Sequence, residues 1–155
     1  MKDNLFSGNV VIITGASSGI GEQTAYKLAE QGAWLALAAR NADKLQAVAN
    51  TCSHLGGKVI AVPTDISDKQ HCKNLIDTTI QKYGRIDTLI NNAGFAVAAR
   101  FTEMKDLDVF EKIIKVNFLG GVYCTHFALP HLLKTNGRLV AVSSMRGKLP
   151  SGTAD

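Results

Sequence analysis

The stretch Val10-Val-Ile-Ile-Thr-Gly-Ala-Ser-Ser-Gly-Ile-Gly21 decides the fold of this chain. Its first four residues are apolar and β-branched, which is typical of a strand buried on both faces of a sheet. Three glycines follow at positions 15, 19 and 21, and a helical pattern continues over residues 20–31. The stretch therefore predicts a buried strand, a glycine-rich turn and a helix in immediate succession.

The same alternation of strand and helix continues along the chain. Short apolar runs predict four further strands, at residues 34–38, 59–62, 86–90 and 139–142. Amphipathic stretches predict three further helices, at residues 45–56, 67–84 and 105–134, and a capping box from Ser67 to Gln70 opens the second of them. Such alternation requires parallel pairing, right-handed crossovers and helices on both faces of the sheet. We therefore predict an α/β fold, a Rossmann-type doubly wound parallel sheet, in a single domain spanning residues 1–155.

Residues 145–155 differ from the rest of the chain, because they form a polar segment with Gly and Pro and no amphipathic pattern. A parallel strand is ordinarily followed by a helix that covers one of its faces, and no such helix follows the strand predicted at 139–142. We therefore expect the sheet to be truncated after its fifth strand, which leaves that strand open to association. A fragment of a longer protein is the favoured interpretation, and a genuine short protein is the alternative.

Composition and charge exclude several classes of protein. The chain carries 17 Lys and Arg against 13 Asp and Glu, and the scattering of these charges argues against a nucleic-acid-binding groove. The apolar runs are far shorter than the ~20 residues that span a bilayer, so no membrane span is predicted. The N-terminus lacks the layout of a signal peptide, and the three cysteines form no C-x-x-C pair. We therefore predict a cytoplasmic protein with no disulfide and no metal site.

The spacing G-x-x-x-G-x-G at Gly15, Gly19 and Gly21 predicts a phosphate-binding turn. Glycines let the backbone turn tightly and let a pyrophosphate approach the first N–H groups of the helix. The spacing is neither the G-x-G-x-x-G fingerprint nor a P-loop, because no Gly-Lys-Ser/Thr follows. An ordinary strand–helix turn is the alternative, but the strand and helix predicted on either side favour the phosphate site.

Five motifs occur in the same order as in a known family. They are Thr14-Gly-x-x-x-Gly-Ile-Gly21, Asp65 after the third predicted strand, Asn91-Asn-Ala-Gly94 after the fourth, Asn117 in the long helix, and Ser143-Ser144 after the fifth strand. Together they resemble the classical short-chain dehydrogenase/reductase family over nearly the whole chain. The resemblance implies an oxidoreductase that interconverts a carbonyl and an alcohol by hydride transfer. It also implies a nicotinamide cofactor and a small-molecule carbonyl or alcohol substrate.

The resemblance further implies which residues bind the cofactor. Gly15, Gly19 and Gly21 would approach its diphosphate, and Asp65 would hydrogen-bond the adenine ring. The other residues implied by their places in these motifs are Ser17, Ser18 and Ile20 in the turn, Ile66 beside Asp65, and Asn91, Ala93 and Gly94 near the adenine-side ribose. A carboxylate that opens the following helix is the alternative for Asp65.

Two more residues are implied in catalysis by the resemblance. The hydroxyl of Ser144 would hold the carbonyl oxygen of the substrate and stabilise developing oxyanion charge. The backbone of Asn117 would hold a water that leads to the family's catalytic lysine. Because Asn is a poor interior helix former, a local kink or a satisfied buried amide is the alternative for Asn117.

The family's Tyr-x-x-x-Lys pair, in which the tyrosine is the acid/base and the lysine lowers its pKa, does not occur in the chain. The tyrosines are Tyr26, Tyr83 and Tyr123, and none of them follows Ser144. We therefore expect the 155-residue chain to be inactive on its own. A non-catalytic nucleotide-binding or dimerisation module is the alternative function. The helix at 105–134 resembles the family's dimer-forming helix, which suggests a homo-oligomer, with a helix that is solvated or covered within the same chain as the other interpretation.

The end of the second predicted strand, Ala38-Ala39-Arg40-Asn41, indicates which cofactor is bound. An NAD site ordinarily carries an Asp or Glu about 20 residues beyond the glycine turn, where the carboxylate hydrogen-bonds the ribose 2′-hydroxyl. No carboxylate stands here, and a guanidinium can bind a 2′-phosphate with paired charge-assisted hydrogen bonds. We therefore predict that Arg40 makes the chain prefer NADP(H) over NAD(H), with a merely solvated Arg40 as the alternative.

Overall fold

A computed structural model describes residues 4–98, 100–104 and 106–144 of the chain. Five parallel strands form one sheet in the order β3-β2-β1-β4-β5. The strands are β1 (Val10–Thr14), β2 (Trp34–Ala39), β3 (Lys58–Pro63), β4 (Thr88–Asn91) and β5 (Arg138–Ala141). The chain builds outward from β1 to β3 and then returns to the other side of β1, so the strand order reverses between β1 and β4. The predicted doubly wound sheet is confirmed, and this reversal is where such sheets bind ligands.

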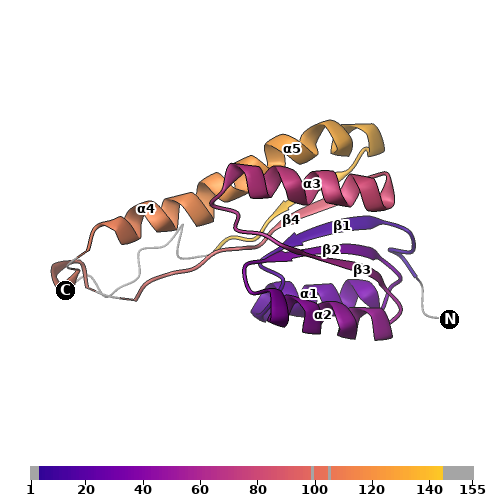
Figure 1. Cartoon of the computed structure of the whole chain (residues 1–155), viewed down its shortest axis with the longest axis horizontal. Coiled ribbons are helices and arrows are strands. Elements are labelled where there is room, and N and C mark those ends of the chain that lie inside the picture. The colour runs from indigo at the N-terminus through magenta and orange to yellow at the C-terminus, as the bar shows by residue number, and fades with distance from the viewer. Residues whose placement is uncertain (1–3, 99, 105, 145–155) are drawn as a thin grey trace.

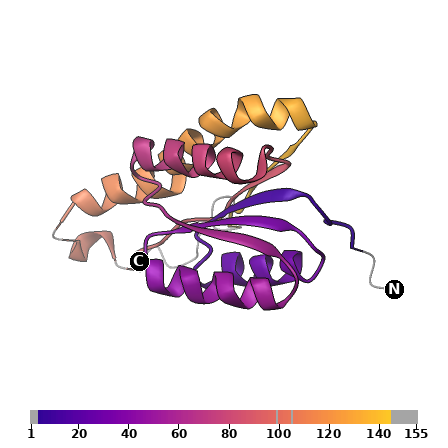
Figure 2. The same cartoon turned by 45° about the vertical axis from the view of Figure 1, so that its right-hand side comes forward.

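Helices cover both faces of the sheet. They are α1 (Gly19–Ala29), α2 (Ala42–His54), α3 (Lys69–Tyr83), α4 (Asp108–Ile114) and α5 (Gly120–Thr135), with a short 3₁₀ turn η1 (Phe101–Glu103) before α4. Figures 1 and 2 show α1 and α2 together on one face of the sheet and α3 and α5 together on the other. Within the part of the chain that the structure describes, no helix combines the length and the apolarity needed to cross a membrane.

Because helices cover both faces of the sheet, the central strand β1 is apolar on both of its sides. All five residues of β1 are buried, because neither face of the strand meets water. Its side chains alternate between two cores: Val11 and Ile13 pack on the side of α1 and α2, whereas Ile12 packs on the side of α3 and α5. The apolar run that decided the predicted fold therefore supplies both cores at once.

The strand β4 begins at Thr88, two residues later than predicted. Asp87 lies at this boundary, and its Oδ2 accepts a hydrogen bond of 2.8 Å from the N–H of Val10. Arg85 forms a salt bridge of 2.6 Å with the other carboxylate oxygen of Asp87. The backbone of Asp87 also bonds to both neighbouring strands: its N–H donates to the carbonyl of Val10 at 2.9 Å, and its carbonyl accepts a hydrogen bond of 2.8 Å from the N–H of Arg138.

The predicted capping box at Ser67 and Gln70 is wrong, because Asp68 is the N-cap of α3. Its Oδ1 accepts hydrogen bonds from the N–H of Gln70 at 2.7 Å and of His71 at 3.2 Å. The hydroxyl of Ser67 instead donates to Asp65 Oδ1 at 2.7 Å. The Ser67 side chain is therefore bonded to Asp65, two residues earlier in the chain, and does not cap the first turn of α3.

We expect an Asp68→Ala substitution to lower the free energy of unfolding by about 1 kcal/mol, because two N–H groups of α3 lose their acceptor. Urea unfolding followed by circular dichroism measures this change. Asp77→Ala is the matched control, because it removes an exposed carboxylate of the same helix that forms a surface salt bridge with Lys73 and does not cap the helix. Equal effects of the two substitutions would contradict the assignment of Asp68 as the cap.

The predicted helix at 105–134 is divided in the structure. α4 begins at Asp108, a π-helical segment η2 (Lys115–Leu119) follows it, and α5 continues to Thr135. A π segment inserts one extra residue into a helical turn and frequently marks a functional site. Asn117 lies inside η2, so the local irregularity considered for this asparagine is present.

The last strand of the sheet, β5, is exposed along its whole length. Leu139, Val140 and Val142 are 50%, 41% and 40% exposed. In the part of the chain that the structure describes, the apolar side chains at 139–142 are thus exposed and β5 pairs only with β4, as expected.

Candidate functional site

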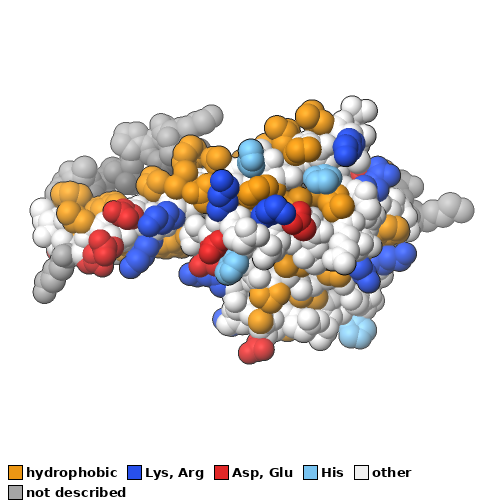
Figure 3. All heavy atoms as spheres, turned by 45° about the horizontal axis from the view of Figure 1, so that its top comes forward, with side chains coloured by type: hydrophobic (Ala, Val, Ile, Leu, Met, Phe, Trp, Pro, Cys, Tyr) orange, Lys and Arg blue, Asp and Glu red, His pale blue; other side chains and the backbone are white. Residues whose placement is uncertain are grey.

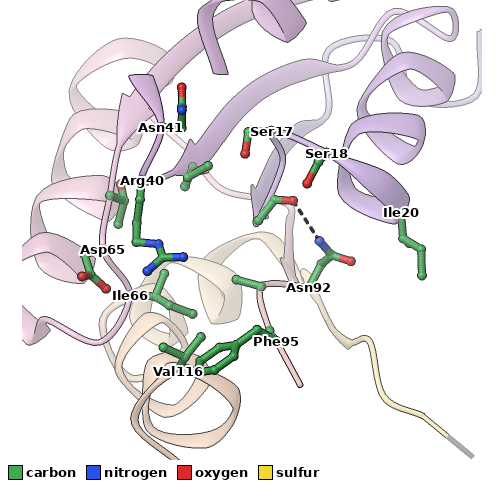
Figure 4. A pocket seen from close by; sticks show the side chains of 16 residues that line it. Ser17, Ser18, Ile20, Arg40, Asn41, Asp65, Ile66, Asn92, Phe95 and Val116 are labelled. Atoms are coloured by element: carbon green, nitrogen blue, oxygen red, sulfur yellow. Dashed lines mark hydrogen bonds between the residues drawn. The ribbon is translucent and has the colours of Figure 1, made fainter. Parts of the chain in front are cut away.

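A cavity of about 660 Å³ lies at the carboxyl ends of the strands, beside the reversal between β1 and β4. Its walls come from the turn after β1, the end of β2, the residues after β3 and the loop after β4, as Figure 4 shows. The predicted cofactor residues that line it are Gly15, Ser17, Ser18, Ile20, Arg40, Asp65, Ile66, Ala93 and Gly94. The fold thus brings most of the predicted site together in one cavity, whose volume is typical of small-molecule sites.

Three predicted cofactor residues, Gly19, Gly21 and Asn91, do not line this cavity. Gly21 is buried in the first turn of α1. The side chain of Asn91 lies on the side of α5, where its Nδ2 donates to the carbonyl of Gly121 at 3.3 Å and to the hydroxyl of Thr125 at 3.0 Å. Asn91 therefore joins β4 to α5, and its contribution to cofactor binding stays a prediction.

The turn after β1 presents the N-terminus of α1 to the cavity. Gly15 and Gly19 have φ angles of 67° and 58°, in the left-handed region that favours glycine. Ser18 is the N-cap of α1, and its hydroxyl makes no capping hydrogen bond. A Cβ built on Gly19 would meet no atom within 4 Å, so the space before the turn is open. Uncapped N–H groups and the helix dipole form a cradle that fits the diphosphate of a dinucleotide.

Asn92 and Thr14 lock this turn to the loop after β4. Asn92 Nδ2 donates to the carbonyl oxygens of Thr14 at 2.9 Å and Gly15 at 3.2 Å. In return, Thr14 Oγ1 accepts hydrogen bonds from the N–H groups of Asn92 at 3.0 Å and Ala93 at 3.1 Å. These four hydrogen bonds fix the position of the turn after β1 relative to the loop after β4, which are two walls of the cavity.

Asn92 also lines the cavity, although it is not among the residues that the sequence predicts for the site. Its position in the Asn91-Asn-Ala-Gly94 motif, next to predicted site residues, could have indicated it. Three further lining residues are not predicted from the sequence: Asn41 after β2, Thr64 after β3 and Val116 in η2. They are far apart in the sequence, so only the folded structure shows that they line one cavity.

Arg40 provides the positive charge of the cavity. It follows β2 directly, is exposed, and forms no salt bridge with any described residue. Figure 4 places Arg40 beside Asp65 and away from Ser18. The Asp65 carboxylate interacts electrostatically with this guanidinium but does not form a salt bridge with it, so the N–H groups of Arg40 have no carboxylate acceptor among the described residues. A guanidinium with free N–H groups can bind a phosphate.

Asp65 is ionised in this arrangement. Burial raises the pKa of its carboxyl, but the hydrogen bonds from the hydroxyl and N–H of Ser67, together with the charges of Arg40 and His71, outweigh burial and hold the pKa below its ordinary value. Both interpretations of Asp65 have support here, since the carboxylate bonds to residues before α3 and also lines the cavity.

Asn117 fixes the loop after β4 to the π segment. Its Oδ1 accepts a hydrogen bond of 3.0 Å from the N–H of Phe95, and its Nδ2 donates to the carbonyl of the same residue at 2.8 Å. Gly94 lies directly beside this pair, where a Cβ would stand 3.3 Å from Asn117 Oδ1. The amide is satisfied, as one alternative supposed, although the residue is exposed. The water-holding role of its backbone stays a prediction.

A second cavity of about 460 Å³ lies between η2, α5 and β5. It shares Ile66 and Ala93 with the first cavity and is lined by Asn117 as well. Ser144, the last described residue, is exposed beyond β5 and lines neither cavity. Among the described residues, no tyrosine or lysine lines either cavity, and no cluster of His, Cys, Asp or Glu could hold a metal ion.

Together, a parallel sheet whose strand order reverses and an anion cradle at that reversal define a nucleotide-binding domain of the Rossmann type. A family model described as short chain dehydrogenase matches residues 9–154. The chain therefore belongs to the short-chain dehydrogenase family.

Similar proteins agree with this assignment. The chain is 49% identical over 142 residues to 11-beta-hydroxysteroid dehydrogenase-like 4A of Arabidopsis thaliana, covering 91% of this chain and 48% of that protein. It is 47% identical over 146 residues to 11-beta-hydroxysteroid dehydrogenase A of Arachis hypogaea, covering 94% of this chain and 42% of that protein. The chain thus spans about half the length of these relatives.

Solved structures show the same fold. A short-chain type dehydrogenase/reductase from Mycobacterium marinum superimposes with a TM-score of 0.88 at 31% identity, covering 95% of this chain and 60% of that chain. An NAD⁺-bound xylitol dehydrogenase superimposes with a TM-score of 0.89 at 28% identity, covering 94% of this chain and 56% of that chain.

Proposed function

We propose that this chain is the cofactor-binding and carbonyl-orienting part of an NADP(H)-dependent dehydrogenase/reductase that interconverts a carbonyl and an alcohol. The observation that carries the proposal is Arg40, which lines the cavity at the end of β2 and forms no salt bridge with any described carboxylate. The matched xylitol dehydrogenase holds NAD⁺, so membership of the family does not choose between the two cofactors. The charge of Arg40 is the feature that favours the phosphorylated one.

Each part of the cofactor has a counterpart in the cavity. The diphosphate would lie against the N-terminus of α1, at Gly15, Ser17 and Ser18, where the helix dipole favours negative charge. The 2′-phosphate would accept hydrogen bonds from the Arg40 guanidinium. The adenine would lie between Asp65 and the apolar side chain of Ile66. Gly19, Gly21 and the Asn91–Gly94 loop would maintain this geometry.

The bound cofactor supplies or accepts the hydride, and the chain's own residues orient the substrate around it. Ser144 would donate a hydrogen bond to the carbonyl oxygen and so stabilise the negative charge that develops there. Asn117 holds the loop at Phe95 beside the cavity, which keeps that wall in place while the substrate is bound. Proton transfer needs a donor near neutral pH, and a free tyrosine titrates near ~10 unless a neighbouring cation lowers its pKa.

The substrate that we propose is an apolar ketone or secondary alcohol. The second cavity adjoins the first and carries the apolar side chains of Phe118, Val122 and Leu139 among its lining residues. The hydroxysteroid dehydrogenases named above have substrates of this class by name. The predicted cytoplasmic location stays a prediction.

A non-catalytic nucleotide-binding module is the second candidate. It is supported by the lack of a tyrosine in either cavity among the described residues. The two candidates share the cofactor site and differ only in turnover.

The test of the cofactor site is a calorimetric or fluorescence titration of the chain with NADPH and with NADH. We expect tighter binding of NADPH, because only NADPH carries the 2′-phosphate that Arg40 can bind. Equal affinities, or tighter binding of NADH, would contradict the proposal for the cofactor while leaving the family assignment intact.

We expect the 155-residue chain alone to show only background turnover with NADPH and a panel of ketones and aldehydes. The chain holds no Tyr-x-x-x-Lys pair, so Ser144 could polarise a carbonyl but no matched proton donor would complete the reduction. Consumption of NADPH measured by absorbance, with cofactor binding confirmed on the same sample, checks this expectation. Robust turnover that Ser144→Ala abolishes would show that another residue of the chain replaces the tyrosine.

A further inference from the structure

Ile66 lines both cavities of the structure and lies in the loop between β3 and α3. Its side chain is buried, with 7% of the residue exposed. Figure 4 shows this side chain on the wall of the first cavity that also carries Arg40 and Asp65. Residues 64–68 belong to no helix or strand, so the position of Ile66 depends on its contacts with neighbouring elements.

The thiol of Cys72 holds the backbone of Ile66 from the side of α3. Cys72 Sγ donates a hydrogen bond of 3.3 Å to the carbonyl oxygen of Ile66, and the cysteine is fully buried. No backbone N–H among the described residues donates to that carbonyl. Because a carbonyl in the interior is costly to leave unpaired, the thiol stabilises the loop in its observed position.

Cys124 of α5 leaves the Cys72 proton available to Ile66. The two thiols are hydrogen-bonded to one another, and this bond lowers the pKa of Cys72 and raises the pKa of Cys124. A hydrogen bond raises the pKa of its donor and lowers that of its acceptor, so Cys124 is the donor and Cys72 keeps its own proton for the carbonyl. Figure 3 shows the layer of α3 and α5 from outside, and both thiols lie beneath its surface because both are fully buried.

Gly120, the first residue of α5, contacts Ile66 from a second element. A Cβ on Gly120 would stand 2.6 Å from Ile66 Cδ1, 2.8 Å from Cγ1 and 2.9 Å from the carbonyl oxygen. The φ of Gly120 is −57°, an ordinary helical value, so the close approach and not the backbone conformation requires glycine here. Two helices therefore fix the place of Ile66, one through a thiol and the other through a missing side chain.

We propose that Cys72 and Gly120 are positioning residues of the cofactor site, which act by fixing Ile66 against the adenine. This role rests on the proposed function, in which the adenine lies beside Ile66. Neither residue lines the first cavity, so both act through Ile66 and do not touch the cofactor. Because NADPH and NADH carry the same adenine, a displaced Ile66 weakens the binding of both by one common factor. The ratio of the two affinities depends on Arg40 and does not change.

Calorimetric titration of the 155-residue chain with NADPH and with NADH tests the role of the thiol. We expect Cys72→Ala to weaken both cofactors by about three- to tenfold, the effect of losing one buried hydrogen bond. Cys72→Ser keeps a donor and should keep both affinities. Cys52→Ala is the matched control, because it removes an equally buried thiol from the core on the side of α1 and α2. Unchanged affinities in Cys72→Ala, or an equal loss in Cys52→Ala, would overturn the proposal for the thiol.

Gly120→Ala tests the contact with α5, and Gly121→Ala is its matched control. Both substitutions favour the helix, but a Cβ on Gly121 would have its nearest neighbour, Asn91 Nδ2, at an ordinary distance of 3.6 Å. We expect only Gly120→Ala to weaken NADPH and NADH, again by one common factor, and thermal unfolding shows that each variant is folded in the titration. Wild-type affinities in a folded Gly120→Ala protein would overturn its role, and if that variant does not fold, the Cys72 variants decide the proposal.

The same titrations separate this proposal from the proposed function. A wild-type chain that binds neither cofactor would contradict the proposed function itself. A wild-type chain that binds NADPH and NADH equally would contradict only the role of Arg40, because each variant is compared with wild type for one cofactor at a time. A loss confined to one of the two cofactors in Cys72→Ala would show that the thiol does not act through the adenine wall, and would overturn the positioning of Ile66.

Discussion

An Arg40→Asp substitution is expected to reverse the cofactor preference of this chain. Arg40 lines the cavity and has no salt-bridge partner among the described residues, so its guanidinium is available to a 2′-phosphate. Hydrogen bonds to charged groups contribute about 1.5–3 kcal/mol, which corresponds to a loss of NADPH affinity on the order of 10- to 100-fold when they are removed. The new carboxylate also repels the 2′-phosphate, which lowers the affinity further.

The same carboxylate should strengthen NADH binding, because it can accept a hydrogen bond from the ribose 2′-hydroxyl. Arg40→Ala separates the two effects: NADPH binding should weaken while NADH binding stays unchanged. Lys82→Asp is the control for net charge, since it makes the same change on an exposed residue in the last turn of α3, outside the cavity. Titration of both cofactors against the four proteins measures the result. An unchanged NADPH affinity in Arg40→Asp would show that Arg40 is only a solvated residue.

A Gly21→Ala substitution is expected to abolish detectable cofactor binding and to destabilise the fold. A Cβ at this position would stand 2.4 Å from the carbonyl oxygen of Gly15 and 2.5 Å from Asn92 Nδ2. Neither atom can withdraw freely, because Asn92 Nδ2 donates to that same carbonyl and to the carbonyl of Thr14. Relief of the overlap must therefore break the bonds that hold the turn against the β4 loop. Overpacking of this kind costs about 1–3 kcal/mol of stability.

Thermal unfolding and NADPH titration of the Gly21→Ala variant measure both effects. Gly8→Ala is the control, because Gly8 has a φ of +74° and nothing within 4 Å of an added Cβ. That variant should lose only the roughly 1–2 kcal/mol of left-handed backbone strain and keep its cofactor affinity. A Gly21→Ala protein that binds NADPH as tightly as wild type would show that the turn does not depend on the Asn92 bonds.

Much of the fold was predictable because strands and helices leave local periodic patterns. The run at 10–13 has no polar alternation, which predicted a strand covered on both faces, and β1 is buried in this way. The boundaries were less predictable where a single side chain decides them. Ser67 and Asp68 are both good N-caps, and the choice between them depended on Asp65, whose carboxylate takes the Ser67 hydroxyl.

Most of the candidate site was predictable for a different reason. Residues that follow parallel strands meet at one edge of the sheet, so the turn after β1, Arg40 and Asp65 converge wherever the strands are adjacent. The Asn91-Asn-Ala-Gly94 motif, however, does not predict which way each of its side chains points. Asn91 and Asn92 are neighbours in sequence, yet the alternation along β4 sends the first toward α5 and the second toward the glycine turn.

The sequence by itself determined the order of the elements, the glycines of the turn and the lack of a carboxylate after β2, because each of these is a property of a few neighbouring residues. The tertiary structure alone decided the bonds between Thr14 and Asn92, the contact of Asn117 with Phe95 and the hydrogen bond from the N–H of Val142 to the carbonyl of Asn91. These depend on β4 pairing with both β1 and β5, which joins residues distant in the chain. Hydrogen bonds between such residues form only in the assembled sheet, so no local pattern records them.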